Sequence, residues 1–129
     1  MIKIIILLVV GLTIGNSYAA SCRYNYHGSL EGVVGFKKKL SIVEKKLSEK
    51  GFQLTKSNQD VDFTILDLDA FCEELDSREF CRKAYGTLRI HFHHQNQTKT
   101  LVKVIEPAFF YTNSEEALSD VLEDIKKCR

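Results

Sequence analysis

The chain lacks tryptophan and contains a single proline, Pro107, in 129 residues. No proline- or glycine-rich tract divides it and no segment repeats, so one domain is expected. The common catalytic motifs are also missing: Gly-x-Ser-x-Gly, His-Glu-x-x-His, Cys-x-x-Cys and the phosphate-binding loop do not occur. The sequence therefore predicts no catalytic residue and no cofactor.

An excess of either charge is also lacking, because 18 Lys and Arg residues stand against 17 Asp and Glu residues. Nucleic-acid binding is not expected, since it calls for a large basic excess. The charges are nevertheless segregated, with lysines crowded in 37–50 and acids in 60–76. Two solvated faces of opposite sign are one interpretation, and electrostatic complementarity with a protein partner is the other. The candidate partner-binding lysines are Lys37, Lys38, Lys45 and Lys46.

The amino-terminal segment has the pattern of a secretory signal peptide. Lys3 precedes the apolar run Ile4–Ile14, and small residues lead to a cleavage site after Ala19. The apolar run is shorter than the roughly 20 residues that span a membrane. We expect residues 1–19 to be removed, which leaves residues 20–129 as an exported domain in the periplasm or outside the cell.

A competing interpretation of the same site is a lipid anchor. Ala19-Ala20-Ser21-Cys22 resembles a bacterial lipobox, in which the cysteine carries the lipid. Lipidation of Cys22 would attach the protein to the outer membrane, and this is the only route by which we expect membrane contact. The sequence does not indicate an oligomeric state.

All four cysteines, Cys22, Cys72, Cys81 and Cys128, follow the expected cleavage site. An even number in an exported domain predicts two disulfides. Cys72 and Cys81 would close a short polar loop, whereas Cys128 would continue the apolar stripe of the last helix and reach Cys22. This pairing and the lipid anchor exclude each other.

The periodicity of apolar residues predicts an α+β fold, with two helices packed on a mostly antiparallel sheet stapled by disulfides. One helix is expected over 33–50, with Gly51 as its stop, and another after an Asn113 or Ser114 cap. Strands are expected over 22–28, 61–71, 86–94 and 100–107. A three-residue loop at 96–98 would place Phe92 opposite Val102 and His91 opposite Lys103.

Three of the four histidines lie in the segment Arg89–Gln97. On a strand, His91 and His93 share a face whereas His94 points to the other. Two ligands make a weak metal site, since zinc sites use three or four. We therefore predict a polar sheet face and no metal, and keep His91 and His93 as candidate ligands. A small secreted metal-dependent hydrolase that uses them with Asp67 is the alternative function.

Three aromatic residues, Phe109, Phe110 and Tyr111, stand in a row before the last helix. We expect at least one phenylalanine to plug the core between sheet and helix. Tyr111 is expected to be the exposed ring and a candidate anchor for a partner.

The stretch Leu40–Leu68 resembles a unit of bacterial envelope proteins through Lys50-Gly51-Phe52 and Asp62-Phe63. Small outer-membrane lipoproteins and the amino-terminal domain of the TolB translocation protein share this layout. The resemblance implies a binding or assembly role in the cell envelope, without catalytic residues. The leading hypothesis is thus a non-enzymatic exported domain that recognises another protein. An inhibitor or immunity protein is a variant of it.

Overall fold

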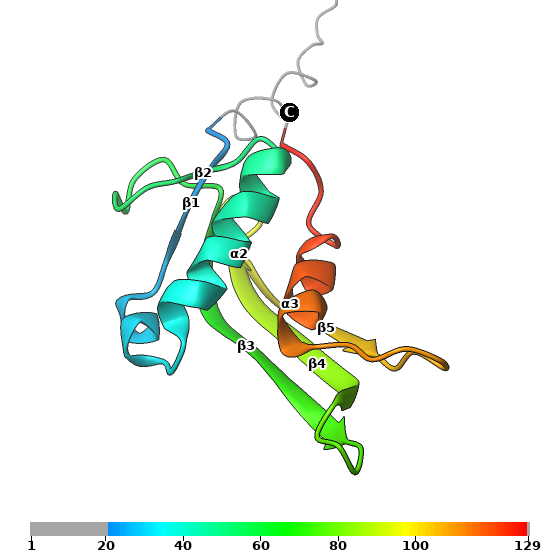
Figure 1. Cartoon of the computed structure of the whole chain (residues 1–129). Helices are drawn as coiled ribbons and strands as arrows, with labels where there is room; N and C mark the ends of the chain where they lie inside the picture. Colours follow the sequence, from blue (N-terminus) through cyan, green and yellow to red (C-terminus); the bar gives the residue numbers. More distant parts are fainter. Residues whose placement is uncertain (1–20, 129) are drawn as a thin grey trace, which may run out of the picture.

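The computed structural model describes residues 21–128 and has the α+β fold that the sequence predicts (Figure 1). The expected signal peptide, residues 1–19, lies outside the described residues. In chain order the elements are β1 (Arg23–Tyr26), the 3-10 helix η2 (Gly28–Gly32), α2 (Phe36–Glu49), β2 (Gln53–Leu54), β3 (Phe63–Leu75), β4 (Cys81–Phe92), β5 (Gln97–Ile105) and α3 (Ser114–Leu122).

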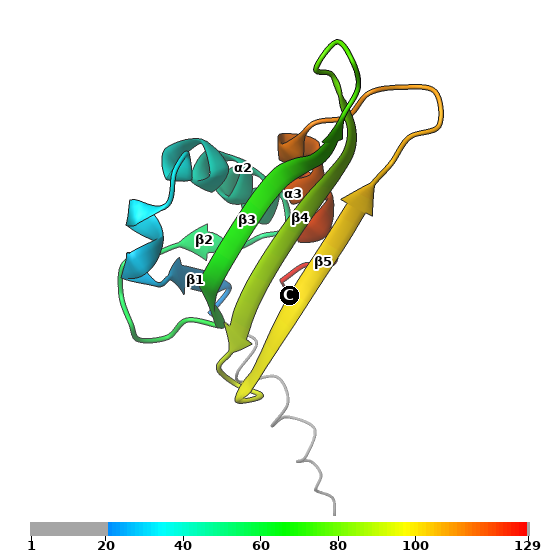
Figure 2. The ribbon, with the colours of Figure 1, turned by 90° about the horizontal axis from the view of Figure 1, so that it is seen from below.

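The sheet has five strands in the order β2-β1-β3-β4-β5. The long strands β3, β4 and β5 are antiparallel, and the short strand β1 runs parallel to both of its neighbours. Both helices lie on one face of the sheet, and Figure 2 shows the other face of the long strands without a helix over it. We call this uncovered side the outer face.

Helix α2 begins and ends at glycines in the left-handed backbone region. Gly35 (φ 73°) precedes its first residue and Gly51 (φ 90°) follows its cap, a conformation that glycine adopts at little cost. The N–H of Phe52 donates to the carbonyl of Leu47, and that of Gly51 to Ser48. These two bonds form a Schellman motif, so Gly51 is the helix stop that the sequence predicts.

Helix α3 begins where Asn113 accepts a hydrogen bond from the N–H of Glu116 at 2.8 Å, which satisfies a donor of the first turn. The helix lies directly on β4 at Gly86. A Cβ at this position would lie 2.3 Å from the carbonyl oxygen of Ala117, so only glycine permits this approach. The core between helices and sheet is completed by Tyr24, Val43, Leu47, Phe63, Ile65, Leu88, Ile90, Leu118, Val121 and Leu122.

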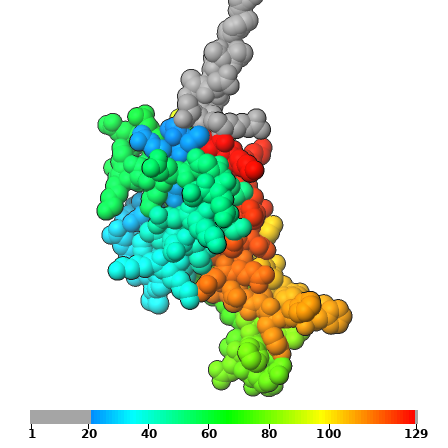
Figure 3. Space-filling model, turned by 45° about the horizontal axis from the view of Figure 1, so that its top comes forward, coloured from blue at the N-terminus to red at the C-terminus, as the bar shows by residue number. Residues whose placement is uncertain are grey.

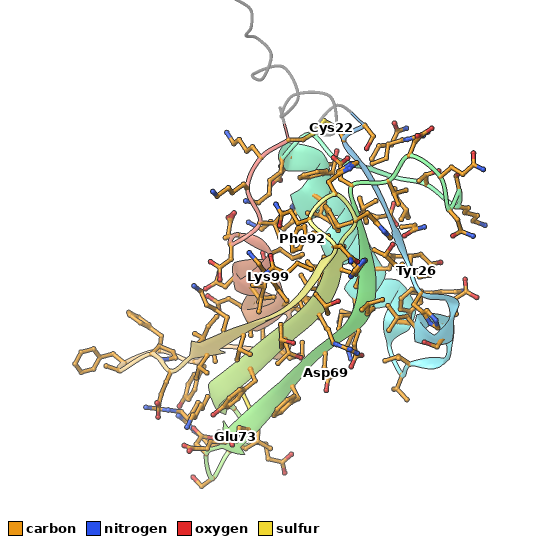
Figure 4. All side chains as sticks on the ribbon, turned by 180° about the vertical axis from the view of Figure 1, so that it is seen from behind. Cys22, Tyr26, Asp69, Glu73, Phe92 and Lys99 are labelled. Carbon is orange, nitrogen blue, oxygen red and sulfur yellow. A yellow bond between two sulfur atoms is a disulfide. The ribbon has the colours of Figure 1, made fainter. Side chains whose placement is uncertain are left out.

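The two disulfides join the same cysteine pairs that the sequence predicts. The Cα atoms of Cys22 and Cys128 are 5.6 Å apart, and those of Cys72 and Cys81 are 5.9 Å apart. Cys128 does not continue the stripe of α3, however, because that helix ends at Leu122. Figure 4 shows Cys22 and Glu73 at opposite ends of the molecule, so one bond lies near each end.

The segment 72–81 forms the end of a β-hairpin, and the polar loop expected there is wrong. Strand β3 continues to Leu75 and β4 begins at Cys81, which leaves residues 76–80 as the turn. Asp76 accepts hydrogen bonds from the N–H groups of Arg78 (2.8 Å) and Phe80 (3.0 Å). Burial alone would raise the pKa of Asp76, but these donors lower it overall.

The predicted register between β4 and β5 is also wrong. Phe92 pairs with Gln97, so the loop contains the four residues 93–96. Val102 and Val104 consequently point to the outer face and are half exposed. The prediction placed Val102 opposite Phe92, but Leu101 is the residue of this segment that packs against the core.

Candidate functional site

Exposed apolar side chains gather at one end of the molecule. Among the described residues nine large apolar side chains are exposed, and Val34 is the only one outside the β3–β4 hairpin, β5 and the loop after β5. Figure 3 shows the hairpin end and this loop projecting from the rest of the surface. Phe71, Val102 and Val104 form an outer strip. Leu75, Phe80, Phe109, Phe110 and Tyr111 form what we call the distal cluster.

Two consecutive rings of the distal cluster face solvent almost completely. Phe109 is 89% exposed and Phe110 is 73% exposed, whereas Tyr111 is 40% exposed. The expectation that one phenylalanine fills the core is wrong, and Tyr111 is the least exposed of the three rings. The space between sheet and helix is already filled by α3 side chains such as Leu118.

Tyr111 is nevertheless an organising residue of this surface. Its ring stacks on Phe80 with centroids 4.8 Å apart. The guanidinium of Arg82 lies 5.4 Å from the ring centroid, and Arg78 donates a hydrogen bond to the hydroxyl. The backbone of the next residue, Thr112, donates to the carbonyl of Cys81 at 3.0 Å. Tyr111 thus ties the aromatic loop to the hairpin end.

The charges around the distal cluster are mixed, with more acids than bases. The bases are Arg78, Arg82 and Lys83. The acids are Glu73, Glu74, Asp76, Glu79 and Glu106. Arg78 and Lys83 form partly exposed ion pairs with Asp76 and Glu73, respectively. Charged residues of both signs are thus close in the chain to the exposed aromatic residues, and Arg78 and Arg82 contact the Tyr111 ring.

Two of the four candidate lysines on α2 hold the helices together. Lys38 pairs with Glu115, and Lys46 Nζ lies 3.0 Å from a carboxylate oxygen of Glu123. The hydrogen bond to Glu123 raises the pKa of Lys46. Lys37 and Lys45 are exposed and form no ion pair within the described part of the chain. The lysine surface is therefore partly neutralised within the fold.

The histidine pair lies on the outer face, at the opposite end of the strands from the distal cluster. The rings of His91 and His93 are 5.0 Å apart. His91 Nδ1 is 2.9 Å from the Thr98 hydroxyl, and His93 Nε2 is 2.6 Å from the Thr64 hydroxyl. Thr98, not Lys103, is the residue opposite His91. Each ring therefore has a hydroxyl partner in addition to the neighbouring imidazole.

Asp67 does not complete a metal site with these histidines. It is displaced along the outer face and pairs across the sheet with Arg89. Within residues 21–128 the one set of three metal-ligating side chains in close reach is Cys22, Asp62 and Cys128. The two sulfurs of that set are bonded to each other, which removes them as thiolate ligands. Among residues 21–128, Asp67, His91 and His93 are therefore not found as one three-ligand set.

Comparisons with known proteins do not identify a family. No protein-family model matches the chain, and no curated protein matches it either. The resemblance of Leu40–Leu68 to envelope domains therefore stays a prediction. No helix in residues 21–128 is long and apolar enough to cross a membrane.

The outer strip and Phe80 were not predicted from the sequence. The available signal was the set of alternating residues Thr98, Thr100, Val102 and Val104, which share one face of β5. Because the other face alternates Lys99, Leu101 and Lys103, both faces are mixed. Periodicity alone therefore does not decide which of them is buried.

Proposed function

We propose that this protein is a non-enzymatic exported domain that recognises another protein through the distal cluster. The observation that carries the proposal is the concentration of exposed aromatic rings at one projecting end. Contiguous exposed apolar surface marks interaction sites in soluble proteins. Aromatic residues and arginine are enriched among the residues that dominate binding energy, and Arg78 and Arg82 flank these rings.

The cysteines support an exported location. Two disulfides are typical of the periplasm or the extracellular space, where thiols are oxidised. The bond between Cys22 and Cys128 occupies the sulfur that a lipid anchor would need, which favours cleavage after Ala19 over lipidation. An inhibitor or immunity protein would use the same surface and differ only in the partner that it covers.

The charges favour a protein over a lipid surface as the partner. Five acids and three bases lie near the distal cluster in the chain, whereas proteins that bind anionic bilayers carry basic clusters beside their apolar side chains. These acidic side chains would repel an anionic bilayer. They would attract a protein partner that carries basic groups at the matching positions.

Site-specific photo-crosslinking in the cells that produce the protein tests this proposal. A photoreactive amino acid replaces Phe110 in one variant and Val34 in the other. Val34 is the matched control because it is 90% exposed but lies before α2, outside the distal cluster. We expect a discrete protein adduct from position 110 and none from position 34.

A second substitution makes the test specific. Phe109→Ser should abolish the adduct formed at position 110, because it removes an 89% exposed ring beside it. Absence of an adduct at position 110, or the same adducts at both positions, would overturn the proposal. Binding to lipid vesicles without a protein adduct would replace a protein partner with a membrane.

A further inference from the structure

A second candidate site lies at the other end of the sheet, near Cys128. It is a hollow with a volume of about 410 Å³, within the range of about 300–1,000 Å³ that is typical of small-molecule sites. Its walls come from the start of β5, the end of β4, the segment after α2 and the segment after α3. The lining residues used below are Phe52, Phe63, Phe92, Leu101, Ile125 and the charged residues at the rim.

The floor of the hollow is apolar and built on the core. Phe63 is 1% exposed and its ring lies 5.1 Å from that of Phe52 and 5.8 Å from that of Phe92, measured between centroids. Ile125 is 4% exposed, and Leu101 packs against the core cluster. Because these side chains are held by the core, the hollow exists without a ligand and costs little ordering to fill.

The rim carries cations without acidic partners. Lys99, Lys126 and Lys127 border the hollow and form no ion pair among residues 21–128. Lys99 Nζ lies 5.8 Å from the centroid of the Phe92 ring, and Figure 4 shows these two labelled residues close together. The ammonium group therefore stands directly beside the apolar floor.

The two acids at the rim have partners of their own. Asp124 lies 3.4 Å from Lys103 Nζ. Asp62 accepts a hydrogen bond from the N–H of Cys22 at 3.0 Å and lies 3.3 Å from His94 Nε2. The three lysines thus remain as the groups able to bind an anionic ligand at this opening.

We propose that this hollow binds a small amphipathic anion, an aliphatic chain that ends in a carboxylate. The chain would lie over Phe92, Leu101 and Ile125, and the carboxylate would interact with Lys99 and Lys127. A charged head beside an apolar body matches what this hollow offers, whereas a fully polar anion would leave the rings uncovered. The site is separate from the distal cluster, and neither requires the other.

Titration with decanoate, below its micelle concentration, and with the uncharged 1-decanol tests the proposal by NMR on the exported protein. We expect shifts confined to residues of the hollow and tighter binding of decanoate. The Lys99→Gln/Lys127→Gln variant should bind decanoate about fivefold more weakly, since two exposed charge contacts are lost, and bind decanol unchanged. The matched Lys37→Gln/Lys45→Gln variant removes the same charge from α2 and should leave both affinities unchanged.

Two further variants locate the ligand. Leu101→Trp, with its fold checked by circular dichroism, should fill the hollow and block both ligands. Phe109→Ser/Phe110→Ser should bind decanoate like the original protein. The proposal is overturned by absence of decanoate binding, by binding insensitive to the Lys99→Gln/Lys127→Gln variant, or by binding lost when the distal phenylalanines are replaced. None of these outcomes bears on the protein adduct expected at position 110.

Discussion

In the part of the molecule nearer Cys22, both helices cover the strands, and the aromatic rings there are buried or half-buried (Figure 1). At the other end, β3 and β4 continue beyond the helices, and the rings face solvent. There Phe71 and Tyr85 stack with centroids 5.4 Å apart, and the Cys72–Cys81 bond joins the strands. We infer from this difference that the covered end supplies most of the stability of the fold. The exposed side chains of the distal end can take part in binding because the core does not depend on them.

The disulfides should show the largest difference between the ends. Replacing Cys22 and Cys128 with serine should lower the free energy of unfolding by about 4–5 kcal/mol, because their bond spans 106 residues. Replacing Cys72 and Cys81 should lower it by about 2–3 kcal/mol, because their bond spans 9 residues. Urea denaturation followed by circular dichroism measures both losses. Equal losses would contradict the expected dependence on loop length.

Gly86→Ala tests the close contact of α3 with β4. The added Cβ would meet the backbone of Ala117, so the helix must move, and we expect a loss of about 3 kcal/mol in the free energy of unfolding. Gly32→Ala is the matched control, since nothing lies within 4 Å of a Cβ there. A Gly86→Ala variant as stable as the control would show that α3 adapts without cost.

Phe109→Ser/Phe110→Ser should separate stability from recognition. Both rings are exposed, so the free energy of unfolding of the double variant should change by less than about 0.5 kcal/mol, while Phe109→Ser alone should abolish the adduct formed by the photoreactive residue at position 110. Leu118→Ala, in the covered part, should lower the free energy of unfolding by about 2–5 kcal/mol. Thermal denaturation of the two variants side by side checks this contrast. A large loss of stability from the serine variant would assign its rings to the core.

The smallest effect is expected from pH at the histidine pair. Burial, followed by the charges of His91 and His94, lowers the pKa of His93 in the folded protein. As pH falls below about 6.5, the unfolded state takes up this proton first, so stability falls; above that pH both states are neutral and the contribution is constant. The fall is small because His93 is exposed. A melting-temperature series from neutral to mildly acidic pH should show it in a His27→Gln variant and show less of it in a His93→Gln variant.

The covered end was largely predictable from sequence, because its signals are local. Gly51 ends α2, Asn113 caps α3, and regular apolar spacing places both helices on the sheet. The distal end was not predictable for a physical reason. Strands that extend beyond the core have no buried partner, so polar residues such as Glu73 and Glu74 give no strand periodicity. Likewise, an aromatic run such as Phe109–Tyr111 reaches the surface only because α3 already fills the core.

The distal cluster was only partly predictable from the sequence, as the residues around Tyr111 show. Tyr111 was named as an anchor from its sequence alone, and the structure places it beside Phe80 and two arginines. Phe80 is 31 positions earlier in the chain, so no local pattern links the two. Their contact follows from the length of the β3–β4 hairpin, which depends on tertiary structure.

The span of the Cys22–Cys128 bond also imposes an order on oxidative maturation. In the exported protein that we propose, Cys72 and Cys81 can join as soon as one hairpin has emerged, whereas Cys22 can reach Cys128 only after both helices and all five strands have emerged. Throughout this interval Cys22 is an accessible thiol on an incomplete chain. Such a protein depends on an oxidising environment in which bonds of Cys22 to Cys72 or Cys81 do not persist, or on an isomerase that returns Cys22 to Cys128.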